Sequence, residues 1–215
     1  METKPPLVQA KVHSFSTPIF QIKFPNSENL NRDLVDVILN REKSEISRPR
    51  SKRGGWQSAP DANIWPEPPF KKLCELAVEA TTSLLTQTYP NAAPIKVALA
   101  ECWANVNYSG AWNVPHNHGT PWAANYYVKT RSEGKHLGAI WFINPVPVSK
   151  NIWQRQQIRI EPEEGEIIIF PGAFMHYVEP NLSEERRIGV AFNFAVNTAS
   201  SPWLLSRPGS RPASS

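Results

Sequence analysis

The N-terminal part of the chain combines one strand pattern with two helical patterns. Residues 14–25 alternate enough to predict a strand, which Pro25 and Asn26 end. From Glu28 to about Ser44, apolar side chains recur at helical spacing and predict a helix. A second helix is predicted from Pro66 to about Gln87, where two prolines in the first turn suit a helix start.

After Pro94 the pattern changes to short β-rich runs separated by turn residues. These runs cover residues 95–108, 123–128, 137–143, 157–162, 165–170 and 186–196. Many short strands with regular turn signals predict a sandwich or barrel, and the two preceding helices would cover one of its outer faces. The fold class is therefore mainly β with flanking helices.

The same patterns divide a single domain into three parts. Residues 1–94 supply a strand, two helices and a basic loop with the sequence GGWQS, all packing on a barrel. Residues 95–199 form the barrel itself. Residues 200–215 form a flexible tail, because its last part, SRPGSRPASS, contains no large apolar side chain to bury.

Composition excludes several classes of protein. A chain of 215 residues can bury a large core without disulfides. The two cysteines, Cys74 and Cys102, form no CxxC motif, which excludes a disulfide scaffold or a thiolate zinc module. No apolar run approaches the roughly 18 residues of a membrane span, and residues 1–10 lack the apolar core of a signal peptide. We therefore expect a cytoplasmic protein with no membrane partner.

The net charge is +4, and many of the cations crowd residues 41–53. One interpretation is an arm that binds nucleic acid. The other is a solvated loop, or a lid whose cations draw an acidic small molecule toward a site. We favour the second, because no aromatic-interleaved nucleic-acid motif accompanies the charges. The pattern does not predict an oligomeric state.

Three of the five histidines suggest a metal site. His116 and His118 are two positions apart on extended backbone, so both imidazoles can face one point. Alone, this pair also fits two surface histidines beside a turn. His176 follows a strand and a Pro-Gly turn, and in a double-stranded β-helix such a late strand lies beside an early one. His176 can then supply a third ligand.

Arg187 begins a strand whose two faces differ. Alternation separates Arg187, Gly189 and Ala191 from a uniformly apolar set that must pack against a core. The first set leaves room for a ligand and ends in a guanidinium, which suits a carboxylate. The alternative is a surface ion pair, a role for which Arg186 is the more natural candidate.

Together these stretches resemble the 2-oxoglutarate- and Fe(II)-dependent oxygenase superfamily, and a prolyl-4-hydroxylase-like branch of it. The resemblance runs from Trp103 to Asn193 and is carried by VNYSGAWNVPHNH, NYYV, GEIIIFPGAFMHYVEPN and ERRIGVAFNF, with GGWQS upstream. It implies a double-stranded β-helix of the jelly-roll or cupin-like type. It also implies Fe(2+), 2-oxoglutarate and O2, and hydroxylation of a C–H bond with release of succinate and CO2.

The resemblance also assigns roles to individual residues. His116 and His176 match the two metal histidines, and Arg187 matches the residue that holds the distal carboxylate of 2-oxoglutarate. Tyr127 matches an aromatic side chain of the cosubstrate pocket, and Asn107 matches a polar position upstream of the first ligand. His118 stands where the usual pattern has Asp or Glu, and three neutral imidazoles would also bind Zn or Cu readily.

Two other functions remain open from the sequence. A cupin-type metal barrel shares the HxH spacing, but Trp122 and Ala123 stand where the cupin glutamate belongs. A barrel that binds a partner without turnover is the other alternative. The substrate is a small molecule or a peptide of unspecified chemistry. Four aromatic residues are candidates for either pocket wall or core, namely Trp112, Trp122, Trp141 and Phe174.

Overall fold

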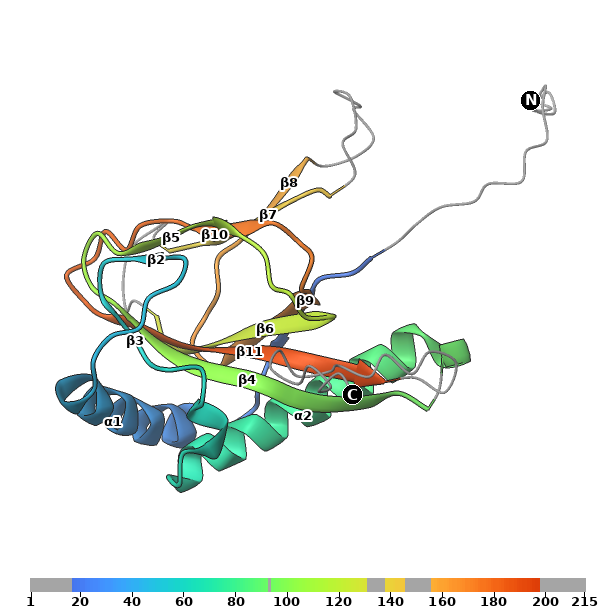
Figure 1. Ribbon diagram of the computed structural model, residues 1–215, viewed down its shortest axis with the longest axis horizontal. Helices are drawn as coiled ribbons and strands as arrows, with labels where there is room; N and C mark the ends of the chain where they lie inside the picture. Colours follow the sequence, from blue (N-terminus) through green and yellow to red (C-terminus); the bar gives the residue numbers. More distant parts are fainter. Residues whose placement is uncertain (1–16, 93, 131–137, 146–155, 198–215) are drawn as a thin grey trace, which may run out of the picture.

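The computed structural model describes residues 17–92, 94–130, 138–145 and 156–197, which form two facing antiparallel sheets and two long helices (Figure 1). The larger sheet has the strand order β1 (Phe20–Lys23), β9 (Glu166–Pro171), β6 (Trp122–Lys129), β11 (Arg187–Asn197), β4 (Lys96–Asn107) and β3 (Trp56–Gln57). The smaller sheet has the order β2 (Lys52–Arg53), β5 (Trp112–His116), β10 (His176–Val178), β7 (Ile140–Ile143) and β8 (Gln157–Ile160). This is the predicted double-stranded β-helix.

Helices α1 (Glu28–Ser44) and α2 (Pro68–Thr88) lie on the face of the larger sheet that points away from the smaller one (Figure 1). Helix α1 has the predicted bounds, and α2 begins two residues later than predicted, at the Pro68-Pro69 pair. Two short 3-10 helices, η1 (Ala62–Ile64) and η2 (Pro90–Ala92), flank α2. Within the described residues, no helix is both long and apolar enough to span a membrane.

One buried cluster joins the helices to the larger sheet. The alternate residues of β11, which include Ile188, Val190 and Phe192, face this layer as predicted and belong to the same cluster as Leu34 of α1 and Phe70 of α2. A second, smaller cluster lies between the two sheets and contains Ala123, Tyr127, Ile140, Phe142, Ile168 and Phe170. The space between the sheets is therefore only partly filled by apolar side chains.

The order of strands in the smaller sheet brings distant segments together. Strand β10 lies between β5 and β7, and the register of its pairing with β5 sets His176 directly opposite His116. On the larger sheet, β11 pairs with β4 so that Arg187 is opposite Asn107. Both pairs of residues line the same cavity between the sheets.

The basic segment differs from its prediction as a loop. It contributes β2 to the smaller sheet and β3 to the larger one, so residues 52–57 cross from one sheet to the other. Gly55 allows this crossing because its φ is +69° and a Cβ there would collide with the Val106 carbonyl. Lys52, expected on a solvated face, is only 2% exposed. His13, His136 and the predicted tail lie outside the described residues.

Replacing Leu34 by Ala should lower the free energy of unfolding by about 2–5 kcal/mol, because the side chain is fully buried and its loss leaves a cavity between α1 and the sheet. Urea denaturation followed by tryptophan fluorescence measures this loss. Asp36→Ala, on the exposed side of the same helix, should change the value by less than about 0.5 kcal/mol. Equal effects of the two variants would mean that α1 does not anchor the sheet.

Candidate metal centre and its pocket

Three histidines meet at one end of the barrel. His116 ends β5, His176 begins β10, and His118 follows two residues beyond β5. The ring centroids of His116 and His176 are 4.2 Å apart, and His118 lies 5.5 Å from the first and 5.2 Å from the second. One nitrogen of each ring lies within 4.8 Å of the other two, a spacing that one metal ion can bridge.

The backbone orients two of these rings. Nδ1 of His116 lies 2.8 Å from the Val114 carbonyl, and Nδ1 of His176 lies 2.9 Å from the Phe174 carbonyl. A carbonyl only accepts, so each Nδ1 carries the hydrogen and each Nε2 keeps a free lone pair. Metal-binding histidines are held in this way, with one nitrogen bound to the backbone and the other directed to the metal. The three residues therefore fit a metal ion.

The centre is electrostatically neutral without a metal. Burial, and after it the neighbouring His116, lower the pKa of His118 to about 4 and that of His176 to about 3. Burial also lowers the pKa of His116. Near neutral pH all three rings are uncharged, which is the form that binds metals.

Ser51, the residue before the crossing segment, touches the centre. Its Oγ lies 3.2 Å from Nε2 of His116, and Nδ2 of Asn113 donates to the same hydroxyl at 3.1 Å. Since Nδ1 of His116 holds the hydrogen, the hydroxyl donates to Nε2. A metal bound at Nε2 would replace this contact, so Ser51 must turn away when the centre is filled.

A cavity of about 70 Å³ runs from the histidines between the two sheets. All six residues predicted from the sequence line it, namely Asn107, His116, His118, Tyr127, His176 and Arg187. Gly189 and Ala191 line it too, so the small face of β11 leaves room beside Arg187 as expected. The cavity thus joins the three imidazoles to the guanidinium in one enclosed space.

The end of the cavity away from the histidines is basic. Arg187 donates through Nη1 to the carbonyl of Gly138, and a Cβ at Gly138 would collide with the guanidinium. Burial lowers the pKa of Arg187. The predicted surface ion pair instead involves Arg186, whose Nη1 lies 2.8 Å from Glu42. Within the described residues, Arg187 has no ion pair, which leaves its remaining donors for an anion.

Lys52 lies beside this end and is a residue that the sequence did not suggest as part of the site. Its Nζ is 2.7 Å from the Trp56 carbonyl, 2.6 Å from the Val106 carbonyl and 2.7 Å from Oδ1 of Asn107. Burial, with the nearby Arg187, lowers the pKa of Lys52 to about 6. The three acceptors oppose this shift, because only the ammonium form has a hydrogen for each of them.

Most of the polar residues that line the cavity were not expected from the sequence. Asn105, Asn113 and Asn125 line the cavity together with Ser51 and Trp103. The signal was present, because Trp103, Asn105 and Asn107 alternate along β4 with residues that face the helices. Of the four aromatic candidates for pocket wall or core, namely Trp112, Trp122, Trp141 and Phe174, none lines the cavity. Trp122 and Phe174 pack against the two core clusters, and Trp112 is exposed.

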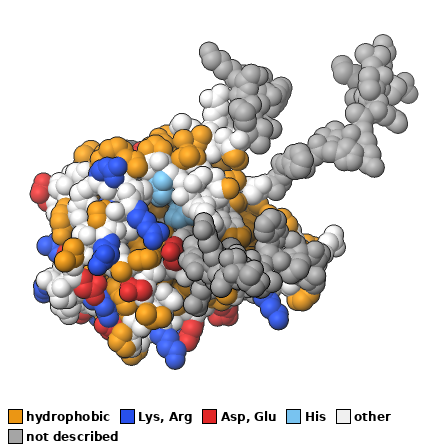
Figure 2. All heavy atoms as spheres, in the orientation of Figure 1, with side chains coloured by type: hydrophobic (Ala, Val, Ile, Leu, Met, Phe, Trp, Pro, Cys, Tyr) orange, Lys and Arg blue, Asp and Glu red, His pale blue; other side chains and the backbone are white. Residues whose placement is uncertain are grey.

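A wider cleft of about 1170 Å³ opens on the other side of the histidines. It shares His116, His118 and Trp103 with the enclosed cavity. Glu101 lies in the cleft, where it accepts a hydrogen bond of 2.8 Å from Nδ2 of Asn193. Histidine side chains reach the molecular surface beside Lys and Arg side chains (Figure 2). The centre therefore lies where the cavity between the sheets meets the wider cleft.

Comparisons with known proteins agree with this arrangement. Residues 101–193 match the model of a family described as "Putative 2OG-Fe(II) oxygenase". A prolyl-4-hydroxylase from Pseudomonas putida is 18% identical with a TM-score of 0.58, covering 84% of this chain and 93% of its own. HygX from Streptomyces hygroscopicus, solved with nickel and 2-oxoglutarate, is 12% identical with a TM-score of 0.59, covering 83% of both chains.

A prolyl hydroxylase from Trichoplax adhaerens, solved with a peptide of hypoxia inducible factor, is 14% identical with a TM-score of 0.59. The match covers 82% of this chain and 83% of the hydroxylase. At these identities the three structures share the fold with this chain. No curated protein matches the sequence.

Replacing His176 by Ala should abolish stoichiometric binding of Fe(II), because the remaining pair of imidazoles is a far weaker chelate. Metal content after anaerobic loading and desalting measures the loss, and circular dichroism monitors the fold. Asn117→Ala is the matched control, because Asn117 is exposed between the two other histidines. Tight binding of one iron by His176→Ala would place the metal elsewhere.

The thermal midpoint of the metal-free protein should fall as the pH is lowered from about 7 to about 5. The histidines of the unfolded chain protonate near pH 6.5, whereas burial holds His118 and His176 neutral to about pH 4 and 3. In that window the unfolded state binds more protons, so acid favours unfolding. Calorimetry in the presence of a chelator should show a smaller pH slope for His176→Gln. Identical pH slopes of the thermal midpoint for the wild type and His176→Gln would show that His176 is not buried as a neutral ring.

Proposed function

We propose that this protein is an Fe(II)- and 2-oxoglutarate-dependent dioxygenase that hydroxylates a C–H bond, a function supported by the match of residues 101–193 to the 2OG-Fe(II) oxygenase family model. The observation that carries the proposal is the single cavity that joins three neutral imidazoles to an arginine without an ion pair among the described residues. When bound, iron and 2-oxoglutarate would supply the oxidising chemistry with O2, and succinate and CO2 would be released.

His116, His118 and His176 would hold the iron. Two of the rings are already oriented by backbone carbonyls, so little ordering remains when the metal binds. His118 replaces the carboxylate of the usual pattern and adds no negative charge. The centre with three imidazoles then keeps more positive charge on the metal, which favours binding of an anionic 2-oxo acid.

Arg187 would bind the distal carboxylate of 2-oxoglutarate. Asn107 is directly opposite Arg187 in the register of β4 and β11, and its Nδ2 is buried with no hydrogen-bond partner among the described residues. An orphaned donor beside a guanidinium fits the oxygens of one carboxylate. Tyr127 packs against this end of the cavity from β6, where burial raises the pKa of its phenol and keeps it neutral.

The substrate would approach through the open cleft. Trp103 lies between the cleft and the cavity and stacks on His118 with ring centroids 5.8 Å apart. It would keep the cosubstrate side dry while the substrate occupies the solvent side. The cleft combines Arg50, Glu101 and Asn193 with apolar side chains, which suits a polar small molecule or a peptide.

Arg187→Leu should weaken binding of 2-oxoglutarate by about 2–5 kcal/mol and leave the iron content unchanged, because the guanidinium would be the main partner of the distal carboxylate. The metal-to-ligand charge-transfer band of the anaerobic Fe(II) protein provides the titration. Arg186→Leu, which removes an exposed neighbouring cation, should bind as the wild type does. If the iron-loaded wild type gives no band, the proposed function is wrong. If the band is undiminished in Arg187→Leu, only the role of this arginine is wrong.

A further inference from the structure

Lys52 is a buried cation outside the proposed metal and cosubstrate contacts. It comes from the crossing segment at residues 52–57, and its ammonium reaches from the smaller sheet to β4 of the larger one. Asn107 lines the cavity, whereas Lys52 does not. Lys52 therefore stands behind Asn107 as seen from the space where a ligand would lie.

The contact with Lys52 fixes the orientation of the Asn107 amide. The ammonium has three hydrogens, and it gives them to two backbone carbonyls and to Oδ1 of Asn107. Turning the amide over would direct Nδ2 at the ammonium, donor against donor, and leave one hydrogen of Lys52 without an acceptor. With Oδ1 held, Nδ2 is the free group, and it has no partner among the described residues.

The charge at this end of the cavity is also unbalanced. Within the described part of the chain, neither Lys52 nor Arg187 forms an ion pair, and Arg187 lies close enough to lower the pKa of Lys52, while the three acceptors of Lys52 favour its ammonium form. Buried cations that repel each other are stabilised by an anion placed between or beside them. The site therefore carries more positive charge than one guanidinium supplies.

We propose that Lys52 is a positioning residue for the distal carboxylate of the 2-oxo acid: it locks the Asn107 amide with Nδ2 toward the cavity, so that Asn107 donates to the carboxylate beside Arg187. The inference rests on the proposed function, since it assumes that 2-oxoglutarate occupies the cavity. Lys52 also polarises the amide, because an ammonium bound to Oδ1 makes the Nδ2 hydrogens stronger donors.

A purely structural role is the competing explanation, because Lys52 also ties the crossing segment to β4. The two explanations differ in which ligands they affect. A loosened segment would weaken the binding of every ligand that chelates the metal. A misplaced Asn107 would weaken only the binding of a ligand with a distal carboxylate. Comparing 2-oxoglutarate with 2-oxopentanoate, which has the same chain length and no distal carboxylate, separates them.

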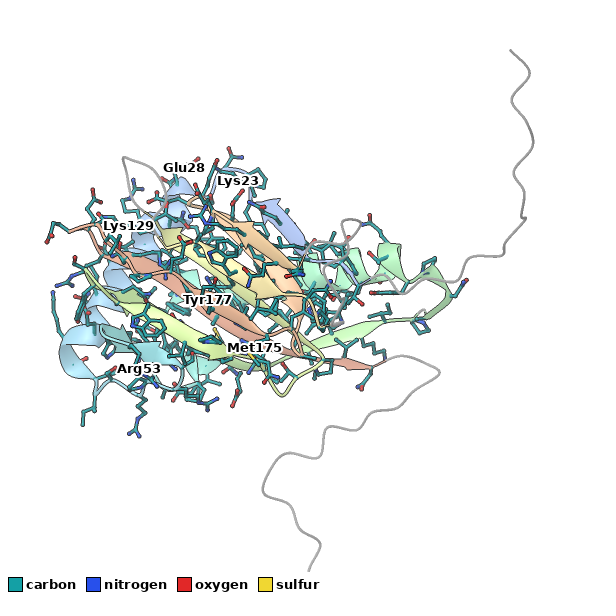
Figure 3. The ribbon with its side chains drawn as sticks, turned by 90° about the horizontal axis from the view of Figure 1, so that it is seen from above. Lys23, Glu28, Arg53, Lys129, Met175 and Tyr177 are labelled. Carbon is teal, nitrogen blue, oxygen red and sulfur yellow. The ribbon has the colours of Figure 1, made fainter. Side chains whose placement is uncertain are left out.

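The experiment titrates both acids into anaerobic Fe(II)-loaded Lys52→Met and follows the charge-transfer band. We expect the dissociation constant of 2-oxoglutarate to rise roughly tenfold to hundredfold, the range for a lost hydrogen bond to a charged group, and that of 2-oxopentanoate to stay within about twofold. Arg53→Met is the matched control, because Arg53 is the next residue and lies exposed at the outer edge of the barrel (Figure 3). It should change neither constant.

Two Asn107 variants test the route of the effect. In an Asn107→Ala background, Lys52→Met should add less than about twofold, because residues that act through each other are not additive. Asn107→Asp offers Lys52 a counter-ion and should fold, yet it replaces the donor with a negative charge and should also weaken 2-oxoglutarate selectively. This variant keeps the proposal testable if Lys52→Met does not fold.

The outcomes are distinct. Equal losses for both acids in Lys52→Met, full additivity with Asn107→Ala, or wild-type affinity of Asn107→Asp for 2-oxoglutarate would each overturn the positioning role. Failure of the wild type to bind either acid would instead overturn the proposed function.

Discussion

The pairing of β5 with β10 is the constraint on which the metal centre depends. It sets His176 opposite His116 on the neighbouring strand, although 60 positions separate the two residues in the chain. A slip of one residue would turn one of the two side chains to the other face and dissolve the centre. The flanking carbonyls of Val114 and Phe174 hold the rings only because this register is kept.

The interior of the barrel is arranged around positive charge. At one end, burial keeps three imidazoles neutral, so the metal supplies the charge when it binds. At the other end, Arg187 and Lys52 are buried as cations and surrounded by amides and backbone carbonyls. Amides accept and donate without adding charge, so they can satisfy these groups and still leave the cavity attractive to an anion.

Much of the fold and the centre of the site could be predicted from the sequence. Alternation along β11 correctly separated the cavity face from the core face, and the helical spacing of α1 fixed both of its ends. These patterns are visible because burial selects apolar residues at a regular period. The two-residue period of extended backbone predicted that His116 and His118 face one point, and the strand arrangement of a double-stranded β-helix predicted that His176 joins them.

The role of the basic segment could not be predicted, because it depends on contacts between distant residues. Lysine is rarely buried, and nothing local marks Lys52 as different from Arg50 or Arg53. Its burial follows from two carbonyls and an amide that the chain supplies from elsewhere, mostly from β4. Short strands such as β2 and β3 are equally hard to predict from the sequence, because two residues are too few to show an alternating pattern.

The residues that contact the two ends of the cavity come from different parts of the sequence. The region shared with the family model begins at residue 101, whereas Ser51 and Lys52 come from well before it. The three histidines and the arginine thus lie inside the matched region, whereas Ser51 and Lys52 come from the segment before it. A barrel with a different segment in this position would keep the three histidines together and would lose the contacts that Ser51 and Lys52 make with His116 and Asn107.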